Sequence, residues 1–282
     1  MVSSLLINES FETYYLSLYA DRWEGLRKSL LEERPAFAFS EGLCVPYFLD
    51  YASVLAARSV RLPSSPAGSS SLSEPSSPAE PSSPAEPCTV LDACAAPGGK
   101  SLVIASALPP GFSLLSNELS ADRRRRLSDA LDKHLDSETR EQVRVSGFDA
   151  AAQGRRKSEH GRYAAILLDA PCSSEAHVLK DGRALAAWTP ARPRFLARRQ
   201  WALLSSAFLL LTAGGSLVYA TCALTHEEND GVARRLLEKY GPAATLDRPD
   251  FAEGEATEFG RIILPDNSGI GPMYVARFRK VF

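Results

Sequence analysis

The sequence has few cysteines, no strong excess of one charge and no long apolar run. No stretch of 18 apolar residues occurs in the 282-residue chain, so no membrane-spanning helix is expected. The segment 1–11 lacks the basic and then apolar pattern of a secretory signal. The 5 cysteines are odd in number and show neither a Cys-x-x-Cys pair nor a Cys/His metal spacing, which argues against a disulfide framework and predicts no metal site. We therefore expect a reducing, cytoplasmic location, where thiols stay reactive.

The formal net charge of −2 excludes a uniformly basic nucleic-acid-binding protein, yet the basic residues are clustered. The clusters are the four-arginine run 123–126, the segment 155–157, and the group Arg192, Arg194, Arg198 and Arg199. Local basic faces attract phosphate groups, although each cluster alone could equally be a solvated helix end or loop.

By composition the chain divides into residues 1–62, residues 63–87 and residues 88–282. The first part is predicted to be a small, mainly helical region, because apolar residues from Trp23 to Leu31 fall at helical spacing before Pro35 and 50–60 fits a second helix. The second part is a Ser/Pro-rich low-complexity linker that buries too little apolar surface to offset the entropy of ordering it. The third part is the main domain, and with 45% apolar residues the chain can fill a real core.

The main domain alternates between strand and helix patterns. Strands are predicted at 89–93, 113–117, 143–146, 164–168 and 216–220, helices at 99–107, 121–134, 195–211 and 226–240, and a closing hairpin at 261–264 and 273–279. This alternation predicts an α/β fold with a Rossmann-like, doubly wound, mostly parallel sheet.

The first predicted strand runs into a glycine turn that opens a helix. Glycines permit a tight turn and close approach of a ligand, and the helix N-terminus presents free N–H groups. The rival interpretation is a phosphate-binding P-loop, because Gly99, Lys100 and Ser101 fit its pattern. The first glycine of that pattern is replaced by Cys94, which disfavours the rival.

Acidic residues follow three successive strands, at Asp92, Glu118 and Asp149. An acid after the second strand is placed to bind ribose hydroxyls, and one after the third could reach an adenine amino group, so an adenosine-containing cofactor is predicted. The alternative is that each acid caps a helix.

A cysteine follows each of the two remaining parallel strands. Cys172 ends the segment Asp169-Ala170-Pro171-Cys172, and Cys222 directly follows Thr221. Ligands bind outside the carboxyl ends of strands in open α/β sheets, so the two thiols are expected to meet in one cleft. That arrangement indicates two-step chemistry with a nucleophile and a second thiol.

Together these motifs resemble the Sun/NOL (RsmB-like) family of RNA 5-methylcytosine methyltransferases. The matching segments are 49–53, 94–101, 117–120, 169–173, 219–222, 261–265 and 271–274, with both cysteine motifs in the family's order and spacing. Departures are Glu118, where many members have Asp, the Ser/Pro-rich insertion, and a short N-terminal region.

The resemblance implies a class I methyltransferase fold with S-adenosylmethionine as the cofactor. The implied cofactor-binding residues are Cys94, Ala95, Ala96, Pro97, Gly98, Gly99, Lys100, Glu118, Arg123, Asp149 and Asp169. Cys222 is implied as the nucleophile at carbon 6 of cytosine, and Cys172 as the group that helps release the product. Asp169 would hydrogen-bond to the base, while Lys100 orients the loop and Asp169.

The implied partner is RNA, with ribosomal RNA favoured over transfer RNA, and the protein is expected to be a monomer with a possible accessory protein for recognition. Two alternatives stay open. A DNA cytosine methyltransferase is disfavoured, because the segment between Cys172 and Ser216 is too short for a target-recognition region and Cys222 would have no purpose. A non-catalytic RNA-binding or ribosome-assembly factor on the same fold would not need the intact cysteines.

Trp188 could stack on a base or pack in the core, and His226 is expected to cap the helix that follows it.

Overall fold

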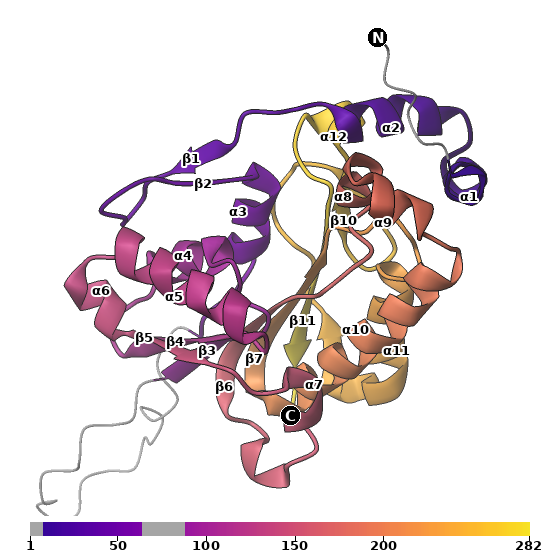
Figure 1. Cartoon of the computed structure of the whole chain (residues 1–282). Coiled ribbons are helices and arrows are strands. Elements are labelled where there is room, and N and C mark those ends of the chain that lie inside the picture. The colour runs from indigo at the N-terminus through magenta and orange to yellow at the C-terminus, as the bar shows by residue number, and fades with distance from the viewer. Residues whose placement is uncertain (1–7, 64–87) are drawn as a thin grey trace, which may run out of the picture.

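The computed structural model describes residues 8–63 and 88–282, and this part of the chain is built on a nine-stranded sheet (Figure 1). In spatial order its strands are β5 (Val143–Ser146), β4 (Phe112–Asn117), β3 (Cys88–Asp92), β6 (Tyr163–Asp169), β7 (Leu211–Thr221), β11 (Met273–Lys280), β10 (Arg261–Ile263) and β9 (Glu255–Ala256), and β8 (Ala244–Leu246) pairs with β11. Neighbours from β5 to β7 are parallel, whereas β11 is antiparallel to β7 and β10. The predicted α/β fold, with its mostly parallel sheet and C-terminal hairpin, is confirmed.

Helices cover both faces of the sheet (Figure 1). One face packs against α3 (Tyr51–Arg58), α4 (Gly99–Ala105) and α5 (Ala121–His134), and the other against α7 (Ala150–Gln153), α10 (Ala191–Leu210) and α11 (Asp230–Tyr240). Strand β6 therefore has apolar residues on both faces, and its residues from Ala165 to Leu168 are fully buried. This is why its sequence is a continuous apolar run rather than an alternating one.

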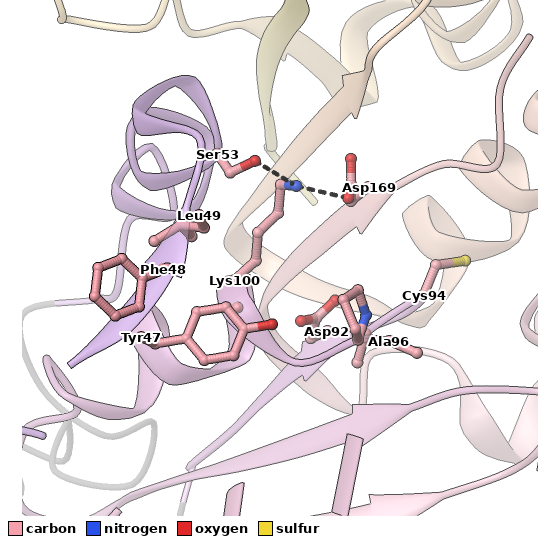
Figure 2. Close-up of a pocket in the computed structure, with 12 residues that line it drawn as sticks. Tyr47, Phe48, Leu49, Ser53, Asp92, Cys94, Ala96, Lys100 and Asp169 are labelled. Atoms are coloured by element: carbon pink, nitrogen blue, oxygen red, sulfur yellow. Dashed lines mark hydrogen bonds and ion pairs between the residues drawn. The ribbon is translucent and has the colours of Figure 1, made fainter. Parts of the chain in front are cut away.

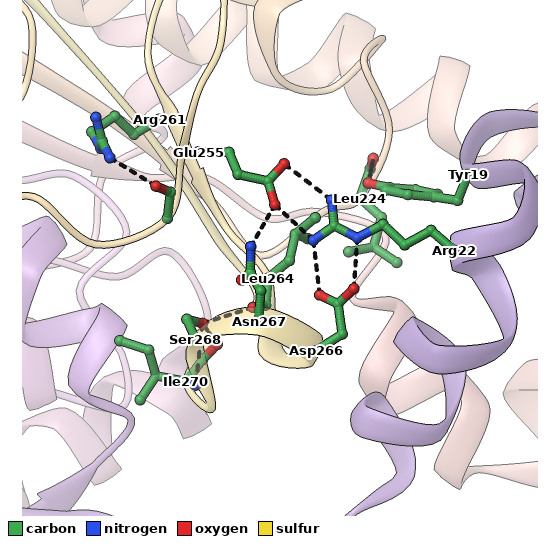
Figure 3. A network of polar contacts seen from close by, with 11 residues as sticks. Tyr19, Arg22, Leu224, Glu255, Arg261, Leu264, Asp266, Asn267, Ser268 and Ile270 are labelled. Atoms are coloured by element: carbon green, nitrogen blue, oxygen red, sulfur yellow. Dashed lines mark hydrogen bonds and ion pairs between the residues drawn. The ribbon is translucent and has the colours of Figure 1, made fainter.

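The N-terminal helices pack beside the ends of β6 and β7. These helices are α1 (Glu9–Tyr19), the 3₁₀ turn η1 (Ala20–Arg22) and α2 (Trp23–Leu31), and they share a core with α8 (Glu175–Lys180) and α9 (Gly182–Ala186). Arg22 pairs with Asp266 of α12 (Pro265–Ser268) at 2.6 Å and with Glu255 at 2.7 Å (Figure 3). The Tyr19 hydroxyl donates to the carbonyl of Leu224 at 2.8 Å, so α1 is tied to the loop that follows Cys222.

Three expectations about element boundaries need correction. The N-terminal region is mainly helical, but it also contains an antiparallel hairpin of β1 (Phe37–Phe39) and β2 (Tyr47–Leu49), whose strands are too short for an alternating pattern to show. Helix α10 begins at Ala191, earlier than expected. Helix α11 begins only at Asp230, so His226 does not cap it.

The delay in α11 has a local cause. The Asn229 side chain accepts from the Thr221 hydroxyl at 2.5 Å and donates to the Ala223 carbonyl at 2.9 Å, which holds the residues after β7 in a loop.

The remaining short helices are α6 (Ser137–Glu141), η2 (Lys157–Glu159) and η3 (Gly241–Ala243). Residues 64–87, nearly all of the predicted Ser/Pro-rich linker, lie outside the described residues. Within the described ranges, no helix has the length and apolar character needed to cross a bilayer.

Candidate active site

Two cysteine thiols meet at the carboxyl ends of β6 and β7. The parallel register sets Asp169 beside Ala220, and two residues beyond Ala220 the Cys222 sulfur lies 2.8 Å from that of Cys172. The backbone N–H of Cys222 points at the Cys172 sulfur at 3.3 Å. Hydrogen bonding to Cys222 and burial raise the pKa of Cys172 well above its usual value. The two thiols therefore meet at this edge of the sheet, as predicted.

Ser174 was not identified from the sequence. Its hydroxyl lies 3.2 Å from the Cys222 sulfur and 3.5 Å from that of Cys172. Its backbone has a φ of 54°, a left-handed conformation that costs a non-glycine residue free energy and is concentrated at functional sites. The strained turn therefore directs a hydroxyl toward both sulfurs.

An ion pair lies next to the thiols. The Lys100 ammonium is 2.8 Å from Oδ2 of Asp169 and donates to the Ser53 hydroxyl at 3.2 Å (Figure 2). Burial lowers the pKa of Lys100, but the charge and hydrogen bond of Asp169, with a smaller contribution from Cys222, outweigh burial and raise it. The lysine thus holds the Asp169 carboxylate, as the sequence analysis expected.

The ion pair lines a cavity of about 250 Å³ between the glycine turn and β2. Tyr47 and Phe48 of the hairpin form its outer wall (Figure 2), and neither was identified from the sequence. A Cβ on Gly99 would lie 2.9 Å from the Tyr47 ring, so glycine is required there for the hairpin to approach the turn. Asp92 also lines this cavity, and its Oδ2 accepts from the Ser101 hydroxyl at 2.7 Å. Burial raises the pKa of Asp92 to about 7.

A second cavity shares Cys94 with the first, and it is lined by the other predicted acids. Glu118 and Asp149 line it together with apolar side chains, namely Leu119, Phe148, Pro171 and Leu203. Asp149 also caps α7 by accepting from the N–H of Ala151 at 3.0 Å, so the capping alternative holds for this residue as well. Apolar walls for a ring and carboxylates for hydroxyl groups fit an adenosyl group.

Arg123 contacts residues that line both cavities. Its guanidinium donates to the carbonyl of Ala96 at 2.8 Å and lies 3.2 Å from Oε2 of Glu118. Arg124 donates to the carbonyl of Glu118 at 2.8 Å. Two arginines of the 123–126 run therefore organise the cleft, a role that charge alone did not indicate.

Trp188 is a core residue. It is 2% exposed and its ring centroid lies 5.0 Å from that of Phe11, so of the two alternatives the structure favours packing over base stacking. His177 is exposed on α8.

The fold is that of class I methyltransferases. Residues 82–279 match the model of the family described as 16S rRNA methyltransferase RsmB/F. The chain belongs to this family, which uses S-adenosylmethionine, and the resemblance to the Sun/NOL proteins is confirmed. The P-loop interpretation is thereby rejected.

Similar proteins support the assignment of the chain to this family. The chain is 40% identical over 196 residues to the ribosomal RNA small subunit methyltransferase F of Aeromonas salmonicida and 37% identical over 195 residues to that of Escherichia coli. Each match covers 67% of this chain and 40% of the relative, so the matched region spans about two fifths of these relatives' length.

Two solved structures share the fold. A methyltransferase homolog protein from Pyrococcus horikoshii superposes with a TM-score of 0.69 and 19% identity, covering 98% of this chain and 96% of that one. NSun6 from the same organism, with SFG, gives a TM-score of 0.64 and 24% identity over 86% of this chain and 55% of that one.

Proposed function

We propose that this protein methylates carbon 5 of a cytosine in RNA, with ribosomal RNA as the substrate, through a covalent bond between the Cys222 sulfur and carbon 6 of the base. The observation that carries the proposal is the 2.8 Å contact between two thiols beside the Lys100–Asp169 ion pair. Ribosomal RNA is favoured because the family and the relatives are named for it. When bound, S-adenosylmethionine supplies the electrophilic methyl group.

The residues that would hold this cofactor follow from the cleft. The Glu118 carboxylate, 4% exposed and steadied by Arg123, is suited to accept from ribose hydroxyls. Asp149 and Phe148 would border the adenine, and the turn 94–100 would face the amino-acid part of the cofactor.

Cys222 and Asp169 would activate the base. Carbon 5 of cytosine is a poor nucleophile, so the Cys222 thiolate first forms a bond to carbon 6 and pushes an electron pair toward carbon 5. The Asp169 carboxyl group would hydrogen-bond to N3 or to the N4 amino group and stabilise the charge that develops in the ring. Lys100 would keep that carboxyl group in position.

Cys172 would complete the reaction. In its thiolate form, the Cys172 sulfur takes the proton from carbon 5 and becomes a thiol, the electrons of that C–H bond restore the double bond between carbons 5 and 6, and the bond from carbon 6 to Cys222 breaks. Cys222 leaves as a thiolate. The 2.8 Å contact between the sulfurs supports this role, because the proton acceptor has to act close to the bond that breaks.

The first turns of α10 supply a surface for the RNA strand. Arg192, Arg194, Arg198 and Arg199 are all exposed there, and none forms an ion pair with a carboxylate of the described residues. Arg192 lies 3.5 Å from the Ser173 carbonyl, next to Cys172, and Phe195 among the arginines is 64% exposed. Arginines beside an exposed aromatic ring suit phosphates and an unstacked base, because the target base must leave its helix.

The test is methyl transfer from labelled S-adenosylmethionine to unmethylated small ribosomal subunits and to transfer RNA, with wild type and Cys222→Ala in parallel. The proposal expects 5-methylcytosine in digests of ribosomal RNA, and none with the variant. Label only in transfer RNA would overturn the substrate, and label at another atom would overturn the chemistry. Absence of label from both RNAs would favour a non-catalytic assembly factor.

A further inference from the structure

Two glutamates are fully buried behind the thiols, and the chemistry above uses neither. Glu175 opens α8 in the segment after Cys172, and Glu228 lies in the loop after Cys222; both are 0% exposed. Within residues 8–63 and 88–282, neither glutamate forms an ion pair with an arginine or lysine. Buried carboxylates without a cation are costly when ionised.

One hydroxyl bridges the two carboxyl groups. The Ser173 Oγ lies within hydrogen-bonding distance of both Oε1 of Glu175 and Oε1 of Glu228, and the Ser173 N–H donates to Oε2 of Glu228 at 3.0 Å. A hydroxyl group has one hydrogen and can donate it to only one of these oxygens. The other contact needs a second hydrogen, which must sit on one of the carboxyl groups.

The same carboxyl groups join the two loops that carry the thiols. Gln200 of α10 donates to Oε2 of Glu228 at 2.7 Å and to the Pro171 carbonyl at 3.0 Å. Oε2 of Glu175 accepts from the N–H of Leu224 at 3.2 Å. The network therefore fixes the segment on either side of Cys172 to the segment that follows Cys222.

Burial and, to a lesser degree, the charge of Glu175 raise the pKa of Glu228 to about 7, against the lowering effect of the hydrogen bonds from Ser173 and Gln200. Burial also raises the pKa of Glu175. The titratable and charged groups around the pair are Tyr14, Tyr15 and Tyr19 of α1, Arg192 and Arg194 of α10, Tyr219 of β7, and Cys172 and Glu227 of the two loops. Of these, the Tyr15 hydroxyl donates to Glu175 at 2.6 Å.

We propose that Glu175 and Glu228 share one proton, and that this singly charged pair is a positioning device that holds Cys172 against Cys222. Loss of the shared proton leaves two negative charges on either side of Ser173, and their repulsion separates the two loops. This inference rests on the proposed function for its catalytic readout, but not for its effect on stability.

The sign of the pH effect follows from the direction of the shift. An acid whose pKa is higher in the folded protein than in the unfolded chain contributes stability that is fully present below the unfolded pKa. That stability is lost between the unfolded pKa and the folded pKa, so the loss is complete near pH 7, and above about pH 7 the folded protein itself loses the shared proton.

Glu228→Gln keeps the hydrogen bonds of this carboxyl group but cannot lose a proton or become charged. The amide oxygen can still accept from Ser173 and Gln200, while the amide nitrogen presents a hydrogen to the Ser173 hydroxyl, where the carboxylic acid proton would sit. Glu175→Gln makes the corresponding change in the other carboxyl group. It provides a second test in case Glu228→Gln does not fold. Glu227→Gln is the matched control, because this neighbouring carboxylate accepts from Tyr14 and does not contact Ser173.

The experiment measures kcat/KM for methyl transfer from pH 6 to 9 and the thermal midpoint of each protein from pH 4 to 9. Thiol ionisation that a variant shares with wild type cancels in the ratio of variant to wild-type kcat/KM. Because the charge of Glu175 contributes to the raised pKa of Cys172, the ratio is read for Glu228→Gln, which keeps Glu175. We expect this ratio for Glu228→Gln to be constant near pH 6 and to rise up to tenfold per pH unit above about pH 7. The thermal midpoint of the variant should gain on wild type from about pH 4.5 to about pH 7 and then level off, and Glu227→Gln should follow wild type.

The outcomes are distinguishable. A flat ratio and a flat difference in midpoint for both glutamine variants would overturn the shared proton. A pH-dependent midpoint with a flat activity ratio would overturn the positioning role. If no protein transfers methyl groups but the midpoints behave as expected, the proposed function fails, and the shared proton stands without its catalytic role.

Discussion

Replacing Lys100 with methionine removes the ammonium that holds Asp169. The pair is 2.8 Å apart, and the two side chains are only 13% and 29% exposed. Two unit charges about 4 Å apart attract by about 4 kcal/mol at an effective dielectric constant of about 20. Partial exposure of Asp169 and the desolvation of both groups offset about half of this, so we expect a net loss of about 2 kcal/mol. In kcat/KM that corresponds to about 30-fold.

A double-mutant cycle with Asp169→Asn measures the same quantity in the free energy of unfolding. We expect the double variant to be about 2 kcal/mol less destabilised than the sum of the single variants. Lys133→Met, on the exposed surface of α5, is the matched control and should be close to wild type. Additivity within about 0.5 kcal/mol, or an activity of Lys100→Met within twofold of wild type, would refute the reasoning.

Two further predictions concern the cofactor and the RNA. Glu118→Ala should weaken S-adenosylmethionine binding, measured by calorimetry, about 10- to 100-fold, because hydrogen bonds to a charged group contribute about 1.5–3 kcal/mol. Glu138→Ala, which changes an exposed glutamate of α6, should bind the cofactor normally. An equal affinity in both variants would contradict the assignment. Arg194→Ala and Arg198→Ala should each weaken RNA binding and reduce the slope of the logarithm of the binding constant against the logarithm of the salt concentration by about 1. Lys239→Ala, on α11, should leave both quantities unchanged. An unchanged slope for the arginine variants would show that α10 is not part of the RNA-binding surface.

Much of the candidate site could be predicted from sequence because its signals are local. Strands β6 and β7 contain apolar runs, and Asp169 and Cys222 lie at or just after the ends of these strands. Once the sheet is parallel, topology alone brings those ends to one edge. The contact between the two thiols follows from the β6–β7 register, which places Asp169 opposite Ala220.

Other parts of the site left no such signal. The strands β1 and β2 have three residues each, so Tyr47 and Phe48 could not be placed on the cavity wall. Glu175 and Glu228 look like surface residues in sequence, since glutamate is seldom fully buried. Their burial depends on the loops after β6 and β7 closing around Ser173, and on Tyr15 from a distant helix.

The most direct test of the central claim is to incubate unmethylated ribosomal RNA and S-adenosylmethionine with wild type, Cys172→Ala and Cys222→Ala, and to look for a protein–RNA adduct on denaturing gels. We expect the adduct to accumulate with Cys172→Ala, because the Cys222–carbon 6 bond forms but is not released, and to be absent with Cys222→Ala. An adduct that accumulates with Cys222→Ala instead would reverse the roles of the two thiols. Methylation without either thiol would contradict the covalent mechanism.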